Sequence, residues 1–401
     1  MITVDEALDQ ILSSISILGV EQVNILNALG RVLSEDIISR RNIPPADNSA
    51  MDGFAVRAAD TLFASRHKPV ILEVIEDIPA GYISRKTVHP GQAARIMTGA
   101  AIPKGADAVV RVEDTDSRDG KAWIFAVAEA GQDIRRAGED VKIGEIVIRR
   151  GSRLRPAEIG MLASLSRSFV SVYQRPLVAI LATGDELVEI DEEAGQGKIV
   201  DSNSYALTAQ VLDCGAVPVR LGIAKDTKEN LLEKFRTAAR ADIIVSSGGV
   251  SVGDFDFVKD IMKEIGSSMK FWRVAMRPGR PLAFGTLEGK PIFGLPGNPV
   301  SSMVSFEQFV RPSILKMMGH AKLFRRTVRA VLKEDIRKKS GLRHFIRAKL
   351  AVEKGEITAA PTGEQGSGIL KSMVLADGLI VLPEDITVAR AGDRVTVQVL
   401  E

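Results

Sequence analysis

The sequence has 401 residues, of which 45% are hydrophobic and 26% are charged, a composition of globular proteins that excludes disordered and fibrous classes. A chain of this length is longer than a domain with a single hydrophobic core usually is, so we expect several domains. Lys plus Arg number 53 and Asp plus Glu number 51, and this balance gives no global positive field for binding nucleic acid.

The numbers and spacing of cysteine and histidine argue against a disulfide-bonded or metal-cluster protein. Cys214 is the only cysteine, which excludes an internal disulfide and a cysteine-built metal cluster and favours a reducing cytoplasm. The four histidines show no metal-ligand spacing, so we expect no zinc site. No apolar run approaches the roughly 20 residues that span a bilayer, so we expect no membrane insertion.

The first part of the chain combines helical and β-type patterns. Residues 3–18 carry apolar side chains at helical spacing behind a Thr3-x-x-Glu6 capping box, which predicts a helix. Short β-type runs follow from 69 to about 150, at 70–75, 107–112 and 123–127 among others. A second helix is predicted at 155–166. The β-rich block therefore looks inserted into an α-containing domain whose two halves flank it.

From residue 176 the pattern changes to alternating strands and helices. Apolar runs at 177–182, 217–223 and 243–245 alternate with helical patterns at 203–214, 228–240 and 256–265. Parallel strands need crossover connections, so this alternation predicts a three-layer α/β domain with a parallel-type sheet. A helix is predicted at about 299–318. The remaining β-type runs, ending in the alternating Val395, Val397 and Val399, predict a small C-terminal β-barrel domain.

Ligands of open α/β sheets bind beyond the carboxyl ends of the strands, and the loop after 177–182 is the first candidate. Gly184 ends this strand and is followed by Asp185 and Glu186. One interpretation is an ordinary strand-to-helix turn with an N-capping Asp. The other is a carboxylate that binds a cation or orients a polar ligand.

The second candidate is the glycine-containing segment 246–256, which follows the run 243–245. Glycines let backbone N–H groups approach an anion, and a helix N-terminus adds a favourable dipole, so phosphate binding is expected. A tight turn with a cap is the alternative. The segment is neither a GxGxxG fingerprint nor a P-loop. Its candidate binding residues are Ser247, Gly248, Gly249, Ser251 and Gly253.

The third candidate is the segment 294–302, in which two prolines fix the backbone. Pro296, Gly297, Asn298 and Pro299 could place N–H groups and hydroxyls around an anion, or could simply end a strand. The preceding turn 276–281 holds Arg277 and Arg280, whose guanidinium forks suit phosphate or molybdate oxygens. Solvated surface arginines are the alternative for this turn.

Seven segments of the chain resemble, in their order, the molybdopterin molybdotransferase family, which includes the bacterial MoeA proteins and the E domain of gephyrin. They are DNSAMDGFAV at 47–56, IMTGA at 96–100, IRRAGED at 134–140, ATGDEL at 182–187, SSGGVSVGD at 246–254, RPGRP at 277–281 and GLPGNPVS at 294–301. The resemblance extends over essentially the whole chain.

This resemblance implies an elongated, L-shaped subunit of four domains that forms a homodimer. Domain I would comprise 1–40 and 137–174, domain II 41–136, domain III 175–322 and domain IV 323–401. The α/β domain would resemble the pterin-adenylylating enzymes of the preceding step. The active site would lie between the α/β domain of one subunit and the β-rich domain of the other.

The resemblance also implies an activity, the Mg²⁺-dependent insertion of molybdate or tungstate into adenylylated molybdopterin with release of AMP. The pterin-adenylylating enzyme and apo-molybdoenzymes would be its partners. The expected catalytic residues are Asp52, Thr98, Glu186, Asp226 and Asp256, and Glu186, Asp226 and Asp256 are the candidates for holding Mg²⁺. The expected cofactor-binding residues are Gly184, Asp185, Arg277, Arg280, Pro296, Gly297, Asn298, Pro299 and those of the glycine segment, with Arg135 and Asp140 from the N-terminal half.

Two departures from the family and two alternative functions remain. The family usually has lysines where this chain has Arg277 and Arg280, and often an arginine where it has Ala137. A dimeric peptide-binding scaffold of the gephyrin type is one alternative, although pure docking would not need the acidic residues. The other is a pterin adenylyltransferase, because the α/β domain alone resembles those enzymes.

Overall fold

The computed structural model describes residues 1–225, 227–248, 264 and 266–400. The chain splits into two compact units, which are described separately. Unit 1 comprises 1–34, 151–159 and 169–401, and unit 2 comprises 35–150 and 160–168. Apart from residue 264, the expected helix at 256–265 lies outside the described residues, as do five expected site residues: Asp226, Gly249, Ser251, Gly253 and Asp256.

The predicted helices are present, with one wrong boundary. The helix predicted at 3–18 ends early, as α1 Val4–Ser13, because Ser13 and Ser14 both turn their hydroxyls onto the Gln10 carbonyl and compete with the helical backbone bonds. The others are α2 Pro156–Ser164, α3 Asn203–Asp213, α4 Lys228–Ala238, α6 Pro299–Ser305 and α7 Arg311–Met317. The short α8 Lys371–Val374 was not predicted. No helix in the described part is long and apolar enough to cross a membrane.

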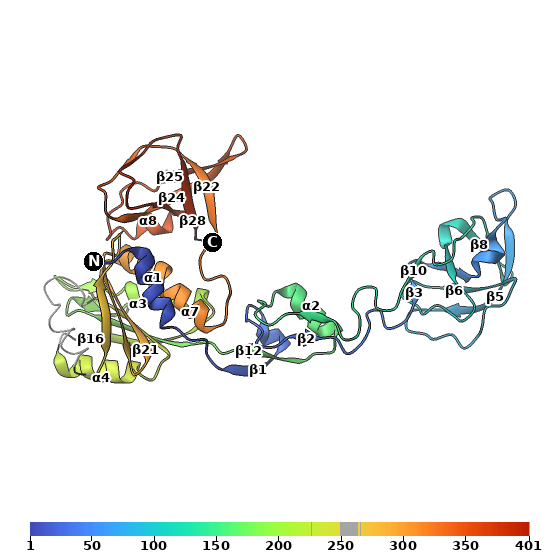
Figure 1. The fold of residues 1–401 in the computed structure, drawn as a ribbon, viewed down its shortest axis with the longest axis horizontal. Helices are drawn as coiled ribbons and strands as arrows, with labels where there is room; N and C mark the ends of the chain where they lie inside the picture. The colour runs from blue at the N-terminus through green and yellow to red at the C-terminus, as the bar shows by residue number, and fades with distance from the viewer. Residues whose placement is uncertain (226, 249–263, 265, 401) are drawn as a thin grey trace. The chain divides into compact units, whose positions relative to one another are not determined.

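The α/β part of unit 1 is built on a six-stranded sheet (Figure 1). Its strand order is β16 Val217–Ala224, β13 Leu177–Thr183, β17 Ile243–Ser247, β21 Lys290–Leu295, β20 Pro281–Leu287 and β18 Ser268–Arg273. The first four strands are parallel, as predicted. The β20–β21 pair is antiparallel, since Glu288 and Gly289 both have positive φ and close a two-residue hairpin. The sheet is therefore mixed.

Helices cover both faces of this sheet, so the expected three layers are present. Val178 and Ile180 of β13 pack in one core with α1, α3, α6 and α7. Ala179 and Leu181, which point to the opposite face, pack in a second core with α4. Figure 1 shows α4 on one side of the sheet and α1, α3 and α7 on the other. Buried apolar residues on both faces explain why β13 reads as a continuous apolar run.

The C-terminal part of unit 1 is a small barrel, as predicted. Strands β24 Arg343–Glu353, β25 Glu356–Pro361, β22 Thr327–Leu332, β28 Arg394–Val399 and β26 Gly378–Leu382 pair in that order, and a β24–β26 pairing closes the circle. The short β19 Met276–Arg277 pairs in parallel with β24. The short β23 Ile336–Arg337 pairs with β27 Val388–Ala389. Elsewhere in unit 1, β1 Val20–Asn24 pairs with β12 Phe169–Tyr173, which joins segments far apart in sequence.

Unit 2 is built on a second six-stranded sheet, as the β-rich pattern predicted. Its order is β7 Ala108–Arg111, β4 Gly53–Val56, β6 Gln92–Ile96, β5 Val70–Ile78, β9 Lys121–Ile124 and β8 Thr115–Arg118. The strand predicted at 123–127 is displaced, because Phe125 N already leaves the ladder and donates to the Asp114 carbonyl (2.9 Å). Short pairs β3 Asn48–Ser49 with β10 Ile134–Arg135 and β2 Ile37–Ile38 with β11 Ile146–Ile148 complete the unit.

Candidate functional site

The three candidate loops of unit 1 begin at the carboxyl edge of the parallel strands, and the second of them is described only as far as Gly248. The register places Ala182 of β13 opposite Ser247 of β17, and Ser247 opposite Leu295 of β21. Each loop therefore begins at the same edge. Gly248 N donates to the Leu295 carbonyl (3.1 Å), which joins the second loop to the start of the third.

Asn203 in the first turn of α3 braces two of these loops. Its side-chain amide donates to Ser247 Oγ (2.8 Å) and to the Gly297 carbonyl (2.7 Å). The buried Asp201 accepts from Ser204 N (3.0 Å) and so holds the start of α3 beside the sheet edge. Sequence reasoning missed Asn203. Its only signal was the run Asp201-Ser202-Asn203-Ser204, which is typical of a helix start.

Backbone segments of the first two loops approach each other closely at Gly248. This residue has a φ of +92°, and a Cβ there would lie 2.4 Å from the Thr183 carbonyl oxygen. Only glycine fits such an approach. The buried Thr183 Oγ1 has no hydrogen-bond partner in the described part of the chain. A polar atom of this kind, turned into the edge where the loops meet, is available to a ligand.

The third loop leads into α6, whose buried hydroxyls are also unsatisfied. Pro299 occupies the first turn after Asn298, and the helical path continues through a π-helical turn at Phe306–Val310 into α7. Within the described residues, the buried Ser302 Oγ and Ser305 Oγ have no hydrogen-bond partner. The arginine turn packs here, since a Cβ on Gly279 would lie 2.4 Å from Ser305 Oγ.

A buried arginine from the barrel adjoins this region. Arg347 of β24 is 1% exposed and donates to Ser372 Oγ (3.1 Å) and the Gly366 carbonyl (3.1 Å). The neighbouring Ser367 carbonyl accepts from Val300 N of α6 (3.1 Å). No carboxylate pairs with Arg347 in the part of the chain that the structure describes. Burial and, secondarily, the charge of Arg277 lower the pKa of Arg347 to about 10.

Arg347 was not among the residues that the sequence suggested. The sequence pattern that could have identified it is a single arginine within the otherwise apolar run 345–348. The structure buries every residue of this run. The two predicted arginines differ from it, because Arg277 and Arg280 are both exposed. Arg277 lies opposite His344 in the β19–β24 pair, and its charge follows burial and Lys338 in lowering the pKa of His344 to about 4. Positive charge thus gathers around Arg277.

The carboxylates of the first loop are exposed. The segment after Gly184 does not enter a helix, so the interpretation of Asp185 as a helix cap is wrong; the chain instead forms β14 Leu187–Val188, paired with β15 Ile199–Val200. Ile199 N donates to the Glu186 carbonyl (2.9 Å), which leaves the Glu186 side chain facing solvent. Among the described residues no three His, Cys, Asp or Glu side chains are grouped to hold a metal.

Unit 2 holds a second group of predicted residues. Asp52 Oδ1 accepts from both Thr98 N and Thr98 Oγ1, each at 2.7 Å. Asp47 accepts from Ala137 N (2.8 Å) and from Arg136 Nη1 (2.6 Å). The β3–β10 pair places Arg135 opposite Asn48, so the segments near 47–52, 96–101 and 134–137 pack together. Arg135 and Asp140 are exposed.

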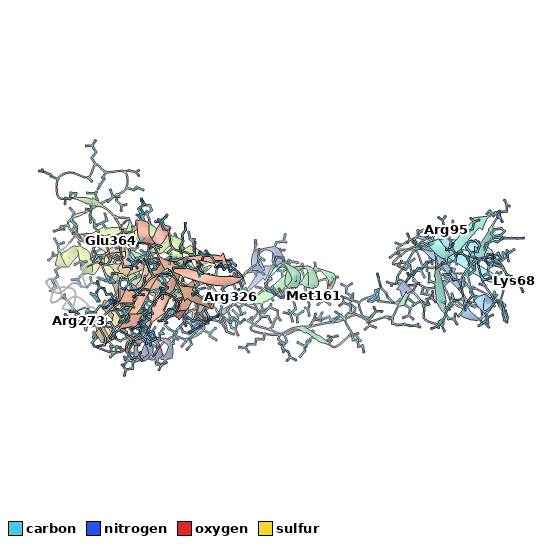
Figure 2. All side chains as sticks on the ribbon, turned by 90° about the horizontal axis from the view of Figure 1, so that it is seen from above. Lys68, Arg95, Met161, Arg273, Arg326 and Glu364 are labelled. Carbon is cyan, nitrogen blue, oxygen red and sulfur yellow. The ribbon has the colours of Figure 1, made fainter. Side chains whose placement is uncertain are left out.

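The hydrogen bonds from Thr98 change the pKa of the Asp52 carboxyl, and this change can be measured. The Thr98 backbone N–H, followed by its hydroxyl and the charge of Arg95 (labelled in Figure 2), lowers the pKa of the Asp52 carboxyl. Because the folded-state pKa is lowered, ionised Asp52 favours the folded state above the usual carboxyl pKa. That contribution is lost as the pH falls through the folded-state value.

Replacing Thr98 with Val should raise the pKa of Asp52 part of the way toward its usual value, because one of the two donors is removed. A carbon-detected NMR titration of the Asp52 carboxyl measures this change. Thr98→Ser keeps the hydroxyl and should leave the pKa unchanged. Equal titration curves for all three proteins would contradict the assignment of this hydrogen bond.

Replacing Asn203 with Ala should loosen the sheet edge and cost about 1–2 kcal/mol of stability, since the buried Ser247 and the exposed Gly297 carbonyl both lose their donor. Asn203→Asp should cost at least as much, because a carboxylate cannot donate and would face the Gly297 carbonyl. Hydrogen exchange of the segment 295–302 measures the loosening. If Asn203→Asp kept normal protection from exchange, the shape of the side chain, and not the hydrogen bonds that its amide donates, would hold the two loops together.

Family comparisons agree with this architecture along the whole chain. Residues 2–166 match the family model of the MoeA N-terminal region (domain I and II), and 329–400 match the MoeA C-terminal region (domain IV). Residues 179–316 match the model described as a probable molybdopterin binding domain. The two MoeA regions thus flank the probable molybdopterin binding domain along the chain.

Curated proteins and a solved structure match over comparable lengths. The Bacillus subtilis (strain 168) molybdopterin molybdenumtransferase is 37% identical over 404 residues, with 100% of this chain and 94% of that protein covered. The protein of the same name from Nostoc sp. is 41% identical over 384 residues, covering 94% and 88%. The crystal structure of the molybdopterin biosynthesis moeA protein from Pyrococcus horikoshii OT3 covers 100% of both chains at 34% identity, with a TM-score of 0.86. The chain therefore belongs to the MoeA family of molybdopterin molybdenumtransferases, transferases of molybdenum cofactor biosynthesis.

Proposed function

We propose that this protein inserts molybdate, or tungstate, into adenylylated molybdopterin in a Mg²⁺-dependent reaction that releases AMP. The observation that carries the proposal is the buried guanidinium of Arg347, which has no carboxylate partner among the described residues and donates to the Gly366 carbonyl, next to the Ser367 carbonyl that accepts from Val300 N of α6. The proposal places the protein in the cytoplasm, as a homodimer, between a pterin-adenylylating enzyme and apo-molybdoenzymes.

Molybdate binding is the part that the buried arginine supports. A buried cation without a carboxylate partner is costly, and a bound oxyanion would compensate its charge. Guanidinium N–H groups donate to tetrahedral oxyanions in a fixed fork, and serine hydroxyls can complete such a site. Arg347, Ser302 and Ser305 are our candidates for holding molybdate, with the exposed Arg277 and Arg280 attracting it.

Pterin phosphate binding is supported by three loops that begin at one sheet edge. Gly248 permits close backbone approach there, and Gly297, Asn298 and Pro299 lead into the helical segment of α6. Backbone N–H groups at the start of a helix can donate hydrogen bonds to an anion. In our proposal Gly184, Asp185 and Ser247 contact the pterin substrate. Pro296 fixes the backbone of the third loop, and Asn203 holds the second and third loops together.

Carboxylate oxygens are the protein ligands that Mg²⁺ prefers, and the exposed carboxylate of Glu186 at the sheet edge fits this role. We propose Glu186, Asp226 and Asp256 as the residues that hold the ion. When bound, Mg²⁺ neutralises phosphate charge as the phosphoanhydride is cleaved. The chain's own residues orient the two substrates and exclude water, so no protein nucleophile is required.

The reaction is tested by mixing purified protein with adenylylated molybdopterin, Mg²⁺ and molybdate. We expect release of AMP and activation of an added apo-molybdoenzyme, both dependent on molybdate. A well-folded dimer that produces neither result would exclude the proposal. Consumption of ATP with molybdopterin alone, without molybdate, would instead indicate the earlier adenylyl transfer.

The residues of unit 2 are tested in the same assay. We propose that Asp52, Thr98, Arg135 and Asp140 act in this reaction, with Asp52 as the ionised acid. Asp52→Asn should abolish turnover while leaving the dimer intact. The control is Asp119→Asn in the same unit, at an exposed position of positive φ that asparagine tolerates. Unchanged turnover in Asp52→Asn would contradict the assignment.

A further inference from the structure

Unit 1 contains a cavity of about 570 Å³ that is separate from the candidate site. It is lined by residues from five parts of the sequence: 29–32, 151–158, 173–175, 213–215 and 311–322. Its basic lining residues include Arg31, Arg153, Arg175, Arg311, His320 and Lys322. All of these residues belong to the same compact unit.

The cavity lies at the edge of the sheet opposite the candidate loops. Arg175 comes two residues before β13, and Gly215 two residues before β16, so both mark the amino ends of parallel strands. The candidate loops begin at the carboxyl ends of the same sheet. Seven residues of β13 separate the two edges by roughly 20 Å, at about 3.3 Å per residue.

The walls of this cavity are held by close packing. A Cβ on Gly319, which has a φ of +75°, would lie 2.3 Å from the ring of Tyr173, so this ring packs directly on the end of α7. The buried Arg31 donates to the Tyr173 carbonyl (2.6 Å) and pairs with Glu21. These contacts connect the β1–β12 region to the helix that forms the far wall.

Positive charge in the cavity exceeds the negative charge that pairs with it. Arg31 pairs with Glu21, Arg311 with Glu307, and Arg155 with Glu158. Asp213, the other acidic residue of the lining, forms an ion pair with Arg325. Arg153, Arg175 and Lys322 form no ion pair in the part of the chain that the structure describes, and Glu21, which already pairs with Arg31, is the one acid whose charge acts on Arg175. All three are exposed, so solvent screens their mutual repulsion, and an anion bound in the cavity would add the counter-charge that the wall lacks.

We propose that this cavity binds a small phosphate-bearing anion, distinct from the substrates at the carboxyl edge of the sheet. Its volume falls within the range of small-molecule sites, about 300–1,000 Å³. Arginine forks match phosphate oxygens bidentately, and Arg153 and Arg175 supply two of them. The anion would join segments from both sides of the inserted sequence to the end of α7.

His320 provides a readout that belongs to this cavity alone. Burial first, and then the charges of Arg153 and Arg311, lower its pKa to about 4. An anion that compensates these arginines would raise the His320 pKa, because the imidazolium form would no longer face uncompensated positive charge. NMR of ¹³C-labelled histidine follows this titration, and His320→Gln assigns the signal.

The test uses the full-length protein with pyrophosphate as the probe, at constant ionic strength. We expect saturable binding by calorimetry together with an upward shift of the His320 pKa. The double variant Arg153→Gln/Arg175→Gln should weaken the binding seen at His320 by at least about tenfold. Arg326→Gln is the control, an exposed arginine of unit 1 that does not line the cavity (Figure 2).

Two results would overturn the proposal. One is a His320 titration that pyrophosphate does not change, even where calorimetry detects binding, because the probe would then occupy only the candidate site. The other is a double variant that alters the monomer–dimer equilibrium in sedimentation without altering the His320 response. The cavity would then receive acidic side chains of a second copy rather than a small anion.

Discussion

Replacing Arg347 with Met is expected to weaken molybdate binding by about 10- to 100-fold and to leave the free energy of unfolding nearly unchanged. Hydrogen bonds to a charged group contribute about 1.5–3 kcal/mol, which corresponds to that range of affinity. Stability should be retained because Met fills a similar volume and removes a buried cation that has no carboxylate partner among the described residues. This gain offsets the lost bonds to Ser372 and Gly366.

Calorimetric titration of molybdate into the protein without pterin measures this effect directly. Arg337→Met is the matched control, since Arg337 is an exposed arginine of the same barrel. It should bind molybdate as the unaltered protein does. Loss of stability by several kcal/mol in Arg347→Met, with affinity unchanged, would instead indicate that Arg347 only supports the 362–370 loop.

Replacing Gly53 with Ala is expected to destabilise unit 2 by about 3 kcal/mol. A Cβ at this position would lie 1.9 Å from the Val110 carbonyl oxygen and 2.9 Å from its carbon, both backbone atoms of the paired strand β7. Neither atom can move without opening the β4–β7 ladder. Asp52, which precedes Gly53 directly, would move with the strand.

Gly160→Ala is the matched control for this change. Gly160 lies within α2, where a Cβ meets no atom within 4 Å, and alanine favours a helix over glycine by about 1 kcal/mol. Hydrogen exchange of peptides from β4 and β7 measures the local stability of the sheet. Gly53→Ala should lose protection there and Gly160→Ala should not. Equal protection in both variants would show that β4 can shift to accept the added methyl group.

Local patterns predicted much of the secondary structure. The capping box at Thr3, the apolar runs of β13, β16 and β17, and the period of α3 and α4 all depend on near neighbours in sequence. They were correct for this reason. The order of short segments such as ATGDEL and GLPGNPVS also identified the family, because each segment is a local turn of fixed composition. The roles proposed for Asp52 and Glu186 stay predictions that the reaction assay tests.

Contacts between distant residues decided the rest. Asn203 joins Ser247 and Gly297 across 44 and 94 residues of sequence, and Arg347 reaches α6 only through the loop at Gly366. The cation-lined cavity likewise draws on five separate segments. A sequence pattern reports which side chains are buried together on one face of an element, whereas the partners across a packed interface are set by how the elements fold onto one another. The loops were therefore visible in the sequence, and the brace, the buried arginine and the cavity appeared only in the tertiary structure.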